Sequence, residues 1–148
     1  MGFDRETSVG YVANHLARLL EKNLAQAIRP LGLTPGQFPV LLALWERDGQ
    51  SQKALVGITD VEQATMANTL ARMERDGLIR READPRDNRS RLVFLTEHAR
   101  ALEPEATAAA EAINERACAG LSPSERDLML SAMRVLIATL SANDGQTE

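Results

Sequence analysis

The feature that most constrains the fold of this chain is a change in hydrophobic period at Gly77. Between Val61 and Asp76, apolar residues recur at the spacing of an amphipathic helix. After Gly77, segments 78–82 and 91–95 contain the residue types that favour strands. The eight residues between those segments, ADPRDNRS (83–90), are turn formers and arginines. The sequence therefore predicts a helix followed at once by a β-hairpin whose tip is basic.

The helix over 61–76 has two faces of different chemistry. At about 100° per residue, Met66, Leu70 and Met73 fall on one stripe, which we expect to be buried. The opposite face is polar and carries small or hydrogen-bonding side chains: Ala64, Thr65, Asn68, Ala71, Arg72 and Arg75. Such a face can approach the base edges of DNA, because alanine leaves room and contacts thymine methyl groups. An inert, solvated helix face is the alternative.

Capping signals place the other helices. Thr34 and Gln37 form a capping box before a helix that ends near 47, which we expect to bury Phe38, Leu41, Leu42 and Trp45. Ser51 caps a short helix to about 57, and Asp60 is expected to cap the helix over 61–76. Further helices are predicted over 7–28 and 96–118, and a second capping box, Ser122 with Glu125, begins a last helix to about 140.

Helix, turn, helix and hairpin in this order predict a mainly α fold with a small β-hairpin wing, the winged helix-turn-helix. We expect a single domain over 1–148, with the winged lobe at about 34–96. Helices at about 7–30 and 97–141 carry more apolar surface than so small a lobe can cover. Burial against a second copy is the economical solution, so the sequence predicts dimerisation helices and a two-fold homodimer.

Positive charge is concentrated in one segment of an acidic chain. The net charge is −4, but residues 72–91 contain seven arginines and five acids, so this segment is +2 and the remainder −6. Arginine is suited to bidentate contact with phosphate and guanine. A solvent face of salt bridges is the alternative interpretation.

Other functional classes find little support. No apolar run approaches the length of a membrane span, the N-terminus lacks the pattern of a signal peptide, and the single cysteine, Cys118, excludes an internal disulfide. We therefore expect a cytoplasmic protein that does not engage membranes. His15 and His98 are isolated, so we expect neither metal nor cofactor, and the absence of a catalytic constellation argues against an enzyme. Cys118 fits helix packing better than redox sensing.

Four segments resemble the MarR family of bacterial regulators in order and spacing: LTPGQFPVLLALWE, VEQATMANTLARMERDGLIRR, DPRDNRSR and VFLT. The wing pattern of Asp84, Asp87 and Arg89 is the most specific part. The chain departs from the family in the turn before the recognition helix, where Thr59 and Asp60 replace a leucine and a glycine. Ala99 likewise replaces a usual glycine.

The resemblance implies roles for individual residues. The helix over 61–76 would be the recognition helix, with Gln63, Thr65, Asn68 and Arg72 facing the major groove or its phosphates. Arg89 would enter the minor groove from the wing tip, and Asp87 would orient wing arginines by ion pairing. Arg86 and Arg91 would contact phosphates. The expected DNA-binding set is Gln63, Ala64, Thr65, Asn68, Arg72, Arg75, Arg86, Asp87, Arg89 and Arg91.

The resemblance also implies a small effector, aromatic or lipophilic, bound between the dimerisation helices and the DNA-binding lobe. Tyr11, His15 and Trp45 are the scarce amphipathic side chains near that junction, although each could simply be packed. The predicted function is a repressor that binds a palindromic operator on double-stranded DNA as a homodimer and leaves it when effector binds. The alternative is a winged-helix protein-interaction module that does not bind DNA.

Overall fold

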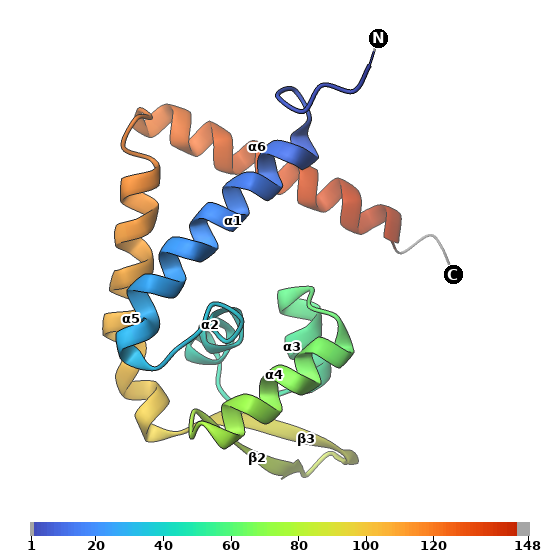
Figure 1. The fold of residues 1–148 in the computed structure, drawn as a ribbon. Helices are drawn as coiled ribbons and strands as arrows, with labels where there is room; N and C mark the ends of the chain where they lie inside the picture. The colour runs from blue at the N-terminus through green and yellow to red at the C-terminus, as the bar shows by residue number, and fades with distance from the viewer. Residues whose placement is uncertain (1, 145–148) are drawn as a thin grey trace. The chain divides into compact units, whose positions relative to one another are not determined.

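The computed structural model describes residues 2–144, which divide into two compact units with the boundary between Glu111 and Ala112. The elements are α1 (Val9–Ile28), the 3₁₀ turn η1 (Arg29–Leu31), α2 (Phe38–Glu46), β1 (Gln50–Ser51), α3 (Gln52–Thr59), α4 (Gln63–Arg75), β2 (Ile79–Asp84), β3 (Asp87–Leu95), α5 (Glu97–Ala117) and α6 (Pro123–Asp144). This order confirms the predicted fold class, a mainly α chain with a β-hairpin after the second helix of a helix-turn-helix. Within the first unit, the hairpin of β2 and β3 lies alongside α4 (Figure 1).

The sheet is antiparallel, with strand order β1-β3-β2. β2 and β3 pair from Ile79 opposite Leu95 to Asp84 opposite Asp87, with an irregularity at 83/84. Only residues 85–86 connect the two strands, so the predicted eight-residue loop was too long. The two-residue strand β1 was not predicted, and it pairs with β3 through Gln50 and Val93.

One hydrophobic core holds the first unit together. The predicted stripe of α4 is confirmed, since Met66, Leu70 and Met73 are fully buried. Prediction failed at Leu42, which is 43% exposed. Leu42 lies about 100° around the helix from the fully buried Leu41, outside the stripe that faces the core.

Two predicted caps are confirmed. The Ser51 hydroxyl accepts a hydrogen bond from the backbone N–H of Ala54 at the start of α3. Ser122 and Glu125 bond reciprocally at the start of α6. The Glu125 carboxylate accepts from the backbone N–H of Ser122, and the Ser122 hydroxyl accepts from the backbone N–H of Glu125. The hydrogen bonds from Ser122 lower the pKa of the Glu125 carboxyl.

The first capping box is incomplete. The Gln37 amide oxygen accepts from the backbone N–H of Thr34 at 3.1 Å, but these residues form a turn and α2 begins only at Phe38. No side-chain hydrogen bond caps this helix. A proline at 35 followed by a glycine favours a tight turn here over the first turn of a helix.

Asp60 does not cap α4, so that prediction was wrong. It ends α3 instead, with a left-handed backbone at φ 55°, and α4 begins at Gln63. Asp60 occupies the place where the family pattern has glycine. An aspartate tolerates this conformation better than most residues. The turn between the two helices is therefore kept without glycine.

The second unit consists of the end of α5 and all of α6. Arg126 on α6 forms an ion pair with Glu115 at 2.5 Å, and Ile113 is buried. Several large apolar side chains of α6 are exposed, and Leu128, Val135, Ile137 and Leu140 are each between 63% and 72% exposed. No helix among the described residues is long and apolar enough to cross a membrane.

Candidate nucleic-acid interface

The polar face of α4 is open to solvent. While its apolar stripe is buried in the core, the opposite residues are all exposed: Gln63, Ala64, Thr65, Asn68, Arg72 and Arg75. The fold therefore presents the side chains that the sequence assigned to DNA, because the core fixes the rotation of the helix about its axis.

Position along α4 divides these side chains into two groups. Gln63, Thr65 and Asn68 lie in the first two turns, whereas Arg72 and Arg75 lie in the last turn. At 1.5 Å per residue, about 13 Å of helix separates Gln63 from Arg72. In helix-turn-helix proteins the N-terminal part of the recognition helix contacts base edges. The first group is therefore suited to reading bases, and the arginines to the DNA backbone.

A cavity of about 350 Å³ lies beside the last turn of α4. It is lined by Thr34, Gly36, Gln37, Thr69, Arg72, Arg75 and Asp76. Asp76 already accepts from the Gln37 amide at 3.3 Å and from Arg75 at 3.4 Å. Within residues 2–144, the guanidinium of Arg72 has no acidic partner, so it is available to an anion.

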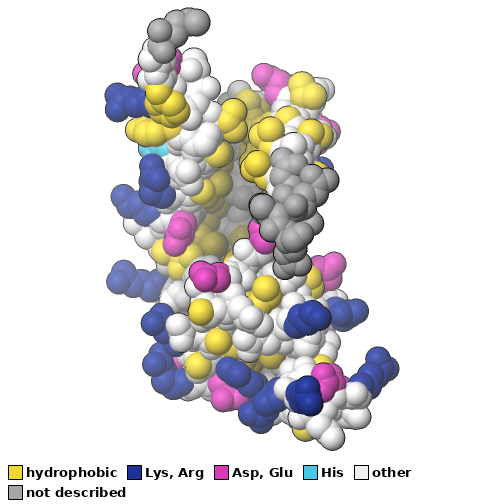
Figure 2. All heavy atoms as spheres, turned by 90° about the vertical axis from the view of Figure 1, so that its right-hand side faces the viewer, with side chains coloured by type: hydrophobic (Ala, Val, Ile, Leu, Met, Phe, Trp, Pro, Cys, Tyr) yellow, Lys and Arg dark blue, Asp and Glu magenta, His cyan; other side chains and the backbone are white. Residues whose placement is uncertain are grey.

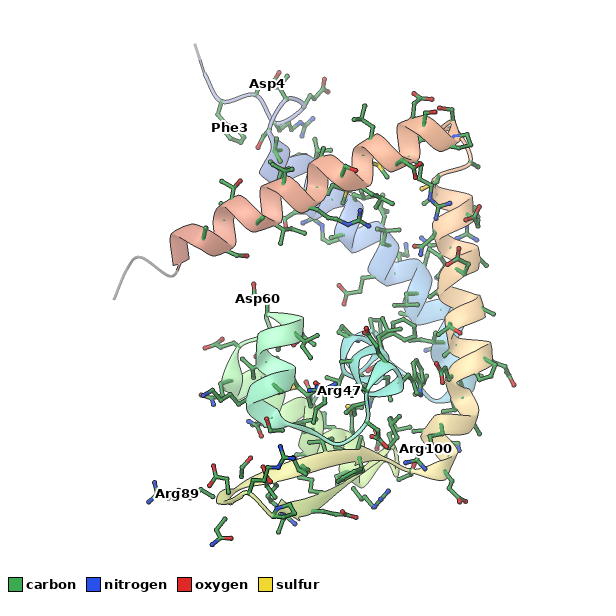
Figure 3. The ribbon with its side chains drawn as sticks, turned by 180° about the vertical axis from the view of Figure 1, so that it is seen from behind. Phe3, Asp4, Arg47, Asp60, Arg89 and Arg100 are labelled. Atoms are coloured by element: carbon green, nitrogen blue, oxygen red, sulfur yellow. The ribbon has the colours of Figure 1, made fainter. Side chains whose placement is uncertain are left out.

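The tip of the wing is shaped by two aspartates. Asp84 accepts from the backbone N–H of Arg86 at 2.9 Å, and Asp87 accepts from the backbone N–H of Arg89 at 3.0 Å. Asp87 was expected to orient an arginine by ion pairing, but its observed bond goes to backbone. Such bonds fix the chain at the tip and leave the guanidinium groups outside. Arg89 projects from the end of the hairpin, away from the sheet (Figure 3).

Not every arginine of the 72–91 segment is free. Arg80 bonds to Glu82 at 3.1 Å and to the Leu95 carbonyl at 3.0 Å, and it stacks over the ring of Phe94. Arg81 lies 3.7 Å from Glu74. In the part of the chain that the structure describes, Arg86 and Arg89 have no acidic partner. The salt-bridge interpretation thus holds for Arg75, Arg80 and Arg81 but not for Arg72 and the wing tip.

A second cavity, of about 440 Å³, lies between the start of α3, the start of α4 and the hairpin. It is lined by Gln52, Lys53, Gln63, Arg81, Asp87, Arg89, Ser90, Arg91 and Val93. Four predicted residues meet here, and Figure 2 shows Lys and Arg side chains around the lower end of the view, where the hairpin lies. Sequence reasoning missed Gln52 and Lys53, because polar residues in a short helix carry no periodic signal. Their place just after the Ser51 cap was the only indication.

The three residues proposed for an effector pocket are not gathered at either cavity. Tyr11 and His15 are exposed on α1. Trp45 is half-buried, its ring N–H donates to the Ala99 carbonyl at 3.0 Å, and its indole meets the Phe38 ring edge-on at 6.1 Å. Trp45 therefore has a packing role, and the effector site remains a prediction.

Within the described residues, no group of three or more His, Cys, Asp and Glu side chains could hold a metal ion. Cys118 is half-buried close to the end of α5.

A helix-turn-helix whose second helix shows a polar face beside an arginine-tipped hairpin defines the winged helix-turn-helix class of DNA-binding proteins. The sequence pattern of the MarR family matches residues 33–90. The transcriptional regulator HosA of Escherichia coli O111:H- is 33% identical over 125 residues, which are 84% of this chain and 93% of HosA. The chain belongs to the MarR family, whose members regulate transcription and are not enzymes.

Two further proteins extend the comparison. The HTH-type transcriptional repressor Rv2887 of Mycobacterium tuberculosis is 30% identical over 128 residues, 86% of this chain and 92% of that protein. The solved structure of Bordetella bronchiseptica BpsR, whose DNA binding is regulated by 6-hydroxynicotinic acid, superposes with a TM-score of 0.79. BpsR is 32% identical, and the match covers 86% of this chain and 97% of that one.

Proposed function

We propose that this transcription regulator is a homodimeric repressor that binds a palindromic operator and is released by a small aromatic acid. The observation that carries the DNA-binding part is the set of unpaired guanidinium groups, Arg72, Arg86 and Arg89, on the exposed face of α4 and at the wing tip. DNA is in the bacterial cytoplasm, so the proposal places the protein there.

The contacts divide by chemistry. Gln63, Thr65 and Asn68 read base edges in the major groove, with Ala64 allowing close approach. Arg89 enters the minor groove. A further set contacts phosphates or shapes the wing: Arg72, Arg75, Arg86, Asp87 and Arg91. A winged-helix interaction module is the weaker alternative, since it has no need for unpaired arginines on both elements.

Dimerisation is supported by the apolar faces outside the lobe. On α1, Val9, Val12, Leu16 and Leu19 are 39–63% exposed. The exposed apolar side chains of α6 add to these, and a monomer rarely leaves so many large apolar side chains in water. A two-fold dimer would present two copies of α4 about 34 Å apart, to successive major grooves.

Repression and regulation by a small effector are supported by the named relatives. Rv2887 is a repressor, and the DNA binding of BpsR is regulated by 6-hydroxynicotinic acid. An effector of this class joins an aromatic ring to a carboxylate. Tyr11, His15 and Trp45 stay the candidates for its pocket.

The test selects bound duplexes from a random-sequence pool and measures the affinity of the winner by fluorescence anisotropy. We expect a palindrome, a sedimentation mass of two chains, and displacement by 6-hydroxynicotinic acid or a related aromatic acid. Selection that enriches no sequence, or a folded monomer of 16.2 kDa at micromolar concentration, would overturn the proposal. Transcription from a promoter that carries the selected site should fall when the protein is added.

A further inference from the structure

We propose that the cavity between α3, α4 and the hairpin is the seat of one DNA phosphate, and that Lys53 is the side chain that binds it. This inference rests on the proposed DNA binding and adds a contact that neither the sequence pattern nor the recognition helix supplies. The occupant is a phosphodiester of the sugar-phosphate strand that separates the major groove from the adjacent minor groove.

The shape of B-DNA places a sugar-phosphate strand between α4 and the wing. In B-DNA, a single sugar-phosphate strand lies between each major groove and the next minor groove. A protein with α4 in one groove and Arg89 in the next must span that strand. The cavity lies between those two elements, because Gln63 of α4 and Arg89 of the wing both line it. The strand therefore passes over the cavity.

The lining has the charge that a phosphate requires. It contains four cationic side chains, Lys53, Arg81, Arg89 and Arg91, against one carboxylate, Asp87. That carboxylate already accepts the backbone N–H of Arg89. The cavity thus offers an excess of cations in a hollow of about 440 Å³ that opens to solvent.

The other three cations are already engaged, which leaves Lys53: the proposed function places Arg89 in the minor groove, and Arg81 and Arg91 make contacts within the protein. Arg81 is held beside Glu74, and its side chain is only 20% exposed. Arg91 of β3 reaches across to the neighbouring strand β2, where it donates to the Arg81 carbonyl at 3.5 Å. Lys53 is exposed and has no acidic partner among residues 2–144. Its ammonium is a compact point charge on a flexible stem, which suits a single phosphate.

A phosphate contact has a distinct signature. It adds the same factor to the affinity for every duplex, because the backbone carries no sequence information. One contact changes the slope of log K against log[salt] by about 0.9, which corresponds to roughly a fivefold gain in affinity at 0.15 M salt.

The test compares Lys53→Gln with Lys22→Gln, because Lys22 and Lys53 are the two lysines of the sequence and Lys22 is an exposed residue of α1. Anisotropy is measured over a salt series on two duplexes of about 30 base pairs, one selected by the parent protein and one of random sequence. Because the proposed dimer carries two copies of Lys53, we expect Lys53→Gln to lower affinity roughly 25-fold on both duplexes and to reduce the slope by about 1.8. Lys22→Gln should bind like the parent, and Lys53→Arg should retain the contact.

Lysine-directed acetylation gives an independent readout by mass spectrometry. The duplex should protect Lys53 from the reagent and leave Lys22 reactive. The proposal is overturned if the parent binds DNA while Lys53→Gln binds with unchanged affinity and slope, or if Lys53 stays reactive in the complex. A loss confined to the selected duplex would make Lys53 a base reader and also refute a phosphate seat. If the parent binds neither duplex, the proposed function itself fails.

Discussion

Asp48 joins three parts of the first unit, and its removal gives a prediction whose size can be worked from the structure. One carboxylate oxygen accepts from the backbone N–H of Leu95 at 2.9 Å, at the end of β3. The other accepts from the Arg100 guanidinium at 2.7 Å, in the first turn of α5. The two bonds differ in surroundings, because Leu95 is buried whereas the Arg100 side chain is 52% exposed.

The two bonds should therefore contribute unequally to the free energy of unfolding. Asp48→Ala leaves the Leu95 N–H without a partner, which costs about 1–3 kcal/mol. Loss of the half-exposed ion pair adds only about 0.2–1 kcal/mol. Asp48→Asn keeps an acceptor for Leu95 and loses the charge, so we expect a cost below about 1 kcal/mol, as for Arg100→Ala.

Urea denaturation followed by circular dichroism, at one fixed protein concentration, measures all three variants. A fixed concentration matters because association stabilises the folded chain. The expected order is a large loss for Asp48→Ala and small, similar losses for the other two. If Asp48→Asn or Arg100→Ala lost as much free energy of unfolding as Asp48→Ala, the ion pair would contribute more than the bond to the Leu95 N–H. That result would refute the prediction.

Three further predictions concern DNA contacts and the start of α6. Arg89→Ala should lower affinity most on operators with A·T-rich flanks, because a narrow minor groove attracts arginine; equal losses on G·C-rich flanks, in the same anisotropy assay, would contradict this. Arg72→Ala should weaken binding similarly on all sequences and reduce the salt slope by about 1 per subunit, or about 2 for the proposed dimer, whereas relaxed preference at one base pair would show that it reads a base. Ser122→Ala should raise the lowered pKa of Glu125 part of the way, since the backbone bond from residue 122, the larger cause, remains. The charged Glu125 carboxylate stabilises the start of α6 fully at a pH above its usual pKa, and this stabilisation is lost as the pH falls through the lowered pKa. NMR titration of the carboxyl measures this pKa, and an unchanged value in Ser122→Ala would count against the capping box.

The helices with strong periodicity were predictable, and their ends were not. Met66, Leu70 and Met73 were placed correctly because burial alone decides that stripe. Asp60 was misplaced because a capping aspartate and an aspartate with left-handed backbone look the same in sequence. A two-residue strand such as β1 has no period to detect.

The candidate interface also has parts that could be predicted from the sequence and parts that could not. The exposed face of α4 could be predicted from the position of its buried stripe. The predicted wing strands were too short, because both faces of the hairpin tip are polar and six of the residues at 83–90 belong to the ends of β2 and β3. Lys53 lines the cavity beside the hairpin only because the fold brings the start of α3 there.

The hydrogen bond from Trp45 to Ala99 makes the intrinsic fluorescence of the protein a probe of the contact between α2 and α5. The chain contains one tryptophan, so all of its indole fluorescence comes from the place where α2 meets the first turn of α5. The emission of an indole shifts to longer wavelength when its ring gains water. Any motion that draws α5 away from α2 would therefore be recorded as a red shift, without a label or an engineered residue. A proposed effector that acts by separating α2 from α5 can therefore be detected by its shift of the Trp45 emission before the operator is known.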